Sequence, residues 1–146
     1  KYIMGKLNVF LREKISGLDT PEVVIETEKE LTILDYDKRQ MYVTGSRQTT
    51  IFEIGEIGSG TFNGNALTYG RITNKGTATV ALTISNANGD EAHFKIGTGK
   101  NFFLSNDYFT STSGSWRDIT TVKCQVDTSS SKNKIEYLVA ADNSVA

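Results

Sequence analysis

Apolar and polar residues alternate with a period of two along much of this chain, most clearly over residues 69–104. This period places one set of side chains on a buried sheet face and the other set toward solvent. Three groups of turn-forming residues separate the alternating runs, namely residues 74–76, 88–89 and 97–99. Asn-Gly and Gly-x-Gly sequences favour tight turns. The stretch therefore predicts four strands of an antiparallel sheet, joined by tight turns.

The rest of the chain predicts further short strands. They are expected at residues 6–12 (with a short helix as the alternative), 23–27, 31–34, 40–45, 50–54, 121–126 and 135–139. Acidic residues 26–30 are expected to interrupt the chain, residues 35–39 to form a turn, and the last two strands to pair as a hairpin. We expect eight to ten of these eleven segments to form strands. That number of strands with frequent turns predicts an all-β fold, an antiparallel β-sandwich or jelly-roll-like barrel.

The length of 146 residues suits a single domain that buries a core without disulfides or metals. We expect one domain over residues 1–146, with residues 1–20 and 141–146 as candidate extensions. The net charge is −1, which offers no attraction for nucleic acid or an anionic membrane surface. No signal peptide and no apolar run of membrane-spanning length is visible.

The chain has one cysteine and one histidine. Cys124 lies between Val122 and Val126 at the two-residue spacing of a buried strand face, so we expect it in the core. The alternation places Phe94 on the buried side and His93 toward solvent. A Cys–His dyad is therefore not expected. A zinc or cupin-type centre needs more nitrogen and sulfur ligands than one of each, so we expect no metal and no cofactor.

Carboxylate pairs raise the alternative of a glycosidase. Asp35 and Asp37 are two residues apart, and Glu53 and Glu56 lie beside a glycine-rich segment. A glycosidase needs two carboxyl groups facing each other across a cleft, and nothing in the sequence places a pair in that way. We therefore expect these carboxylates to be solvated surface groups, and we expect the protein not to be an enzyme.

A calcium-like spacing occurs at Asn86, Asn88 and Asp90. The glycine and glutamate that complete an EF-hand loop are missing, so a hairpin turn centred on Asn88 and Gly89 is the preferred interpretation. Glycines 55, 58 and 60 lack the Lys-Ser/Thr that follows in a phosphate-binding loop. Residues 97–100 are likewise expected to form a hairpin turn.

Three large aromatic residues stand out in a polar segment, residues 106–117. They are Tyr108, Phe109 and Trp116. They form either a small cluster that caps one end of the sandwich, or a contact surface for a protein or a sugar. We take these three residues as the candidate interaction surface.

The pattern of turns and alternating strands in residues 69–85, with residues 94–96 and 102–104, resembles that of small β-sandwich proteins of tailed-phage virions, among them those of crAss-like phages of gut bacteria. Ig-like modules with an Asn-x-Gly turn show a similar pattern. The resemblance covers about a quarter of the chain and includes no site motif, so it transfers no functional residue. It implies a capsid auxiliary or decoration protein, or a ring protein of the neck or tail.

We therefore expect a non-enzymatic structural protein of a tailed-phage virion, made in the host bacterial cytoplasm. Its expected partners are copies of itself and other virion proteins (capsid, portal or tail subunits), and neither nucleic acid nor a membrane. Assembly would use sheet edges and loops. The alternative is a carbohydrate- or host-surface-binding module, such as an adhesin or fibre domain, in which the three aromatic rings stack on the ligand.

Overall fold

The computed structural model describes residues 5–19, 21–55, 62, 64, 66–105, 119–127 and 132–141. These residues form ten strands and no helix. The strands are β1 (Gly5–Ile15), β2 (Val23–Ile33), β3 (Asp35–Val43), β4 (Thr49–Glu53), β5 (Leu67–Asn74), β6 (Val80–Asn86), β7 (Glu91–Ile96), β8 (Asn101–Ser105), β9 (Ile119–Val126) and β10 (Asn133–Ala141). All their pairings are antiparallel, which confirms the predicted fold class.

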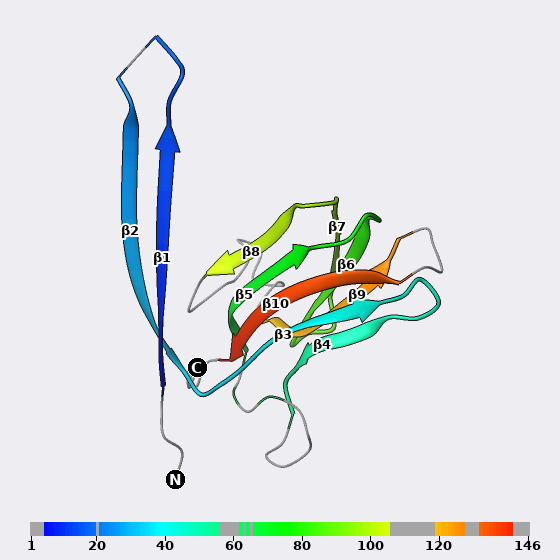
Figure 1. Ribbon diagram of the computed structural model, residues 1–146. Coiled ribbons are helices and arrows are strands. Elements are labelled where there is room, and N and C mark those ends of the chain that lie inside the picture. The colour runs from blue at the N-terminus through cyan, green and yellow to red at the C-terminus, as the bar shows by residue number, and fades with distance from the viewer. Residues whose placement is uncertain are drawn as a thin grey trace.

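Eight of these strands form a sandwich of two four-stranded sheets, with the strand orders β3-β10-β5-β8 and β4-β9-β6-β7 (Figure 1). The pairings are nested, since β3 pairs with β10, β4 with β9, β5 with β8 and β6 with β7. This is the strand order of a jelly roll. Strands β3 to β10 thus resemble one long hairpin, folded back at Asn88 and Gly89 and wrapped into two layers.

The central turn of this long hairpin is the predicted one. Gly89 adopts a positive φ of 88°, a conformation that glycine reaches without steric cost. The side-chain oxygen of Asn86 accepts hydrogen bonds from the backbone N–H groups of Asn88 (3.0 Å) and Asp90 (2.9 Å). The calcium-like spacing is therefore explained by side-chain-capped turn geometry.

The other two turn predictions were right about the reversal and wrong about the pairing. Residues 75–79 join β5 to β6, and residues 97–100 join β7 to β8, but in both cases the two strands lie in opposite sheets. The expected final hairpin is wrong for the same reason, because β9 and β10 also lie in opposite sheets. Turn residues specify that the chain reverses. The long-range pairing decides which sheet the next strand joins.

Two predicted interruptions near the N-terminus are also wrong. Residues 26–30 continue β2, and residues 35–39 begin β3. The short helix considered for residues 6–12 is instead part of β1. Acidic side chains are compatible with a strand whose face is solvated. Arg12 pairs with Glu26 at 3.2 Å, and Lys6 pairs with Glu30 at 3.2 Å, both across the two strands.

The main core lies between the two sheets. Cys124 is fully buried there, as predicted, and burial raises the pKa of its thiol to about 12. Ile96 is buried as expected, whereas Phe94, predicted to be buried, is 45% exposed. The reason is position, because β7 is the edge strand of its sheet and Phe94 lines a groove that opens at that edge.

Two asparagines are buried at one end of the sandwich. Asn74 donates to the carbonyls of Ala78 (2.7 Å) and Ile96 (2.9 Å), and its own oxygen accepts from Asn133 at 2.9 Å. The Asn133 oxygen accepts from the Ala78 N–H at 2.9 Å. A Cβ added at Gly76 would lie 2.0 Å from the Asn133 oxygen, so only glycine fits there. The pair connects three segments that are distant in sequence.

Candidate interaction surface

The first two strands stand apart from the sandwich. β1 and β2 pair along their whole length, from Gly5 opposite Ile33 to Ile15 opposite Val23. We call this hairpin the arm. Figure 1 shows it in blue, rising beside the sandwich and extending past the β8 side. One residue, Leu34, separates it from β3, and the Leu34 N–H donates to the Ala141 carbonyl at 2.9 Å.

The arm has two chemically different faces. Residues directly opposite each other in an antiparallel pair point to the same side of the sheet. One side, the apolar face, carries Leu7, Val9, Leu11, Ile15, Val23, Ile25, Leu31 and Ile33, along with Glu13, Thr27 and Lys29. The other side, the charged face, carries Lys6, Asn8, Phe10, Arg12, Lys14, Val24, Glu26, Glu28, Glu30 and Thr32.

The base of the apolar face is packed against the sandwich. Leu31 is fully buried and Ile33 nearly so, in a cluster with Tyr69 of β5 and Ala140 of β10. Leu7, Val9 and Leu138 are partly buried against the same cluster. Tyr69 and Ala140 are paired with each other and lie outside the main core cluster. The arm therefore rests on the outer side of the β10–β5 pair.

The outer half of the apolar face has no such cover. From Phe10 to the tip, every described residue of the arm is exposed, up to Lys29 on the returning strand. The uncovered part of the apolar face consists of Leu11 (43% exposed), Ile15 (53%), Val23 (43%) and Ile25 (50%). A two-stranded hairpin is marginally stable in water on its own. An apolar face of this kind is typical of a surface that another molecule covers.

A second apolar surface lies on the side of the sandwich formed by edge strands β7 and β8. A groove of about 220 Å³ opens there between the two sheets. Its lining is apolar throughout: Ile84, Ala92, Phe94, Phe102, Phe103, Leu104 and Ile119. The rings of Phe94 and Phe102 meet across the two sheets at 5.5 Å, and Phe103 is 46% exposed at the rim.

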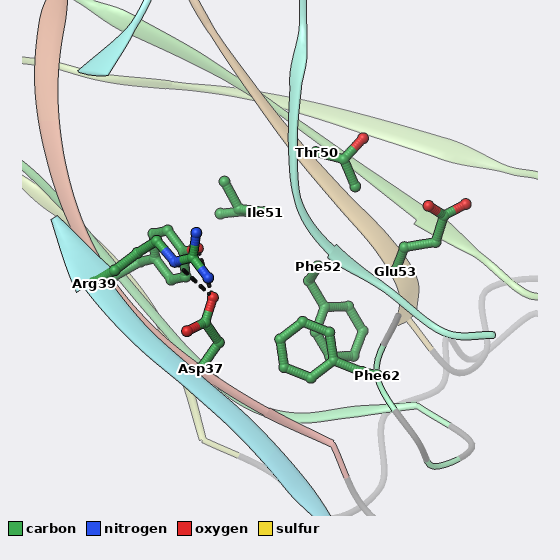
Figure 2. Close-up of a pocket in the computed structure, with 8 residues that line it drawn as sticks. Asp37, Arg39, Thr50, Ile51, Phe52, Glu53 and Phe62 are labelled. Atoms are coloured by element: carbon green, nitrogen blue, oxygen red, sulfur yellow. Dashed lines mark hydrogen bonds and ion pairs between the residues drawn. The ribbon is translucent and has the colours of Figure 1, made fainter. Parts of the chain in front are cut away.

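The opposite side of the sandwich, between β3 and β4, holds a more polar cleft of about 290 Å³ (Figure 2). Asp37 accepts a hydrogen bond from the Tyr137 hydroxyl at 2.8 Å and pairs with Arg39 at 2.9 Å. Burial and this contact with the Asp37 carboxylate raise the pKa of Tyr137. Glu53 lines the same cleft, but Figure 2 shows its carboxylate turned away from Asp37. The two acids do not form a facing pair.

The other residues considered for chemistry are also placed. His93 lies on the exposed side of β7, with Nδ1 3.2 Å from the Thr83 hydroxyl and Nε2 3.5 Å from Glu91. Cys124 faces the core, so the two do not meet. In the part of the chain that the structure describes, no three His, Cys, Asp or Glu side chains gather to hold a metal ion. Nor does any helix there reach the length and apolarity needed to cross a membrane.

The predicted aromatic surface, Tyr108, Phe109 and Trp116, lies outside the described residues, as does Glu56. The surface that the structure does place, the arm, overlaps residues 1–20, a candidate extension in the sequence analysis, but its pairing as a hairpin with residues 23–33 was not predicted. The alternation of Leu7, Val9 and Leu11 was visible. This alternation predicts a strand with one face to be covered, but not what covers that face.

Comparisons with protein-family models, curated proteins and solved structures find no match to this chain.

Proposed function

We propose that this protein is a non-enzymatic structural subunit of a tailed-phage virion, a capsid auxiliary, decoration, neck or tail component. It assembles with further copies and with other virion proteins. The observation that carries the proposal is the arm, whose apolar face is covered by the sandwich at its base and uncovered in its outer half. Such a feature serves association between molecules, because within its own chain it leaves apolar surface in water.

The fold is compatible with this role. Jelly rolls form many viral capsid domains, and also lectin and cupin domains, so this support is an argument by analogy of fold. The virion setting rests on the resemblance of the turn-and-strand pattern in residues 69–104 to that of small virion β-sandwich proteins. The residues weighed for catalysis have structural contacts instead: Asp37 is held by Arg39 and Tyr137, and Cys124 is a core residue.

The assembly proposal is tested by light scattering on the purified protein and on two matched double variants. Leu11→Thr with Ile25→Thr removes two side chains from the uncovered apolar face. Phe10→Thr with Val24→Thr removes two exposed apolar side chains from the charged face. Threonine suits strands, so both variants keep the arm. We expect the wild type and the second variant to form oligomers of one defined size, and the first variant to shift to monomers.

Two outcomes would overturn the proposal. A wild-type protein that stays monomeric at every accessible concentration removes the assembly role, and glycan binding that disappears in Trp116→Ala would then favour the carbohydrate-binding alternative. The virion setting is tested separately, by mass spectrometry of purified particles of a phage that encodes the chain. Absence from those particles contradicts it.

A further inference from the structure

We propose that the uncovered outer half of the arm's apolar face docks in the β7/β8 groove of a second copy of this chain. The inference rests on the proposed assembly role and names the surfaces that make the contact. On the arm they are Leu11, Ile15, Val23 and Ile25. On the second copy they are the residues that line the groove.

The two surfaces match in chemistry. All seven side chains that line the groove are apolar, and so are the four uncovered side chains of the arm. Glu13 shares this face, opposite Ile25 and between Leu11 and Ile15. Its carboxylate has to stay in solvent at the margin of the contact, because a buried unpaired charge would oppose docking. Phe94 and Phe103 at the groove are each nearly half exposed, and an aromatic rim of this kind contributes strongly when it is covered.

The contact also continues an interface that already exists. The base of the same apolar face rests on the outer side of β5 and β10 in its own chain. Figure 1 shows the arm passing the β8 side of the sandwich as it leaves. In the proposed contact the second copy lies against that side and covers the uncovered half of the face. The same face then rests on two sandwiches in succession.

Sheet edges add a polar component to this contact. In the described part of the chain, β1, β2, β7 and β8 each pair with one strand only. An arm strand that lies beside β7 or β8 of the second copy can exchange backbone hydrogen bonds with that edge. Its alternate side chains then enter the groove, which is the usual mode of strand addition.

The small area of one arm-to-groove contact favours a closed assembly, in which each copy makes two such contacts. Six residues on each arm strand span about 20 Å, and two strands with their side chains about 10 Å, so one face offers roughly 200 Å². This is small against the roughly 800 Å² per partner of a stable interface. Each copy carries one arm and one groove and so makes the contact twice. A head-to-tail contact of this kind closes into a ring when the rotation between copies permits.

The test is a disulfide between different copies. Untagged protein with Leu11→Cys on the arm is mixed with tagged protein carrying Ala92→Cys in the groove, and the mixture is oxidised. Cys124 does not take part in disulfide formation because it is fully buried. The control replaces Leu11→Cys by Glu28→Cys, which lies on the charged face of the same arm. We expect roughly tenfold more linked heterodimer from the first mixture, since a disulfide forms only between closely placed Cβ atoms.

A second pair, Ile25→Cys with Phe103→Cys, tests the same contact at two other positions. It is expected to give the same result, even if a substitution in the first pair disturbs the structure around it. Equal linkage in test and control mixtures for both pairs, with wild-type oligomers intact, overturns the arm-to-groove contact and leaves the assembly role standing. A wild type that is monomeric in light scattering, with no linkage in any mixture, overturns both.

Discussion

Replacing Leu31 by alanine should release the arm without unfolding the sandwich. Leu31 is the one arm residue that is completely buried against the outer side of the sandwich, in a cluster with Tyr69 and Ala140. It lies outside the cluster that fills the main core. Its loss therefore removes contacts of the arm base and leaves the packing between the two sheets unchanged.

The magnitude follows from the burial at the arm base. Complete burial of a leucine or isoleucine side chain stabilises by about 1.5–3 kcal/mol, and Leu31 and Ile33 are the two arm residues buried to that degree. Leu7 and Val9 are partly buried and contribute roughly half as much each. These values give an upper limit of about 5–9 kcal/mol for arm docking. Leu31→Ala should remove about 2 kcal/mol, which is about a 30-fold change in the opening equilibrium.

Native-state hydrogen exchange measures this change residue by residue. Amides of β1 and β2 that open with the arm should exchange about 30-fold faster in Leu31→Ala, while those of β6 and β9 keep their protection. The matched control is Leu82→Ala, which removes the same side chain from the main core. It should lower the melting temperature of the sandwich. If Leu31→Ala instead lowered the melting temperature as much as Leu82→Ala and left arm exchange unchanged, the arm would not be a separately docked unit.

Two further substitutions test the interior. Gly76→Ala should lower the free energy of unfolding by about 2–4 kcal/mol, because the new Cβ displaces the Asn133 side chain and leaves buried polar groups unpaired; a melting temperature equal to that of the wild type would contradict this. Cys124→Ser should cost about 1–3 kcal/mol at pH 7 in urea unfolding, because it buries a hydroxyl. The wild-type thiol has a pKa of about 12 when folded and 9.0 when unfolded, so the unfolded chain alone loses that proton between these values. Wild-type stability then falls by about 1.4 kcal/mol per pH unit from this group, and the gap to Cys124→Ser narrows above pH 9. A gap that stays constant to pH 11 would refute the burial argument.

Local pattern was sufficient to predict the strands and the central turn, and insufficient to predict how the strands are connected. The alternation around Val80 and Leu82 reports a face to be buried, and Asn88 with Gly89 reports a tight reversal. Neither carries information about a partner a hundred residues away. The nested pairing of β3 with β10 depends on such a partner, and so the predicted hairpin between the last two strands was wrong.

The hairpin of the arm was not predicted, for a different physical reason. Sequence reasoning looks for a functional surface where large aromatic rings occur among polar residues, and Tyr108, Phe109 and Trp116 satisfied that rule. The arm consists of ordinary alternating strands, and its charged face has the composition of any solvated sheet. Its outer half differs from a sandwich strand only because no second sheet lies over it, which is a property of the three-dimensional arrangement.

The pairing of β3 with β10 has a consequence for the order in which the chain folds. Asp37 and Tyr137, which hydrogen bond there, are separated by 100 positions, so this pairing closes one of the longest loops in the chain. Contacts between such distant positions form slowly, and β10 is the last strand to leave the ribosome. Leu138 and Ala140, on which the arm rests, belong to β10. A chain that lacks β10 therefore lacks the residues on which the base of the arm packs, so docking of the arm has to follow the pairing of β10.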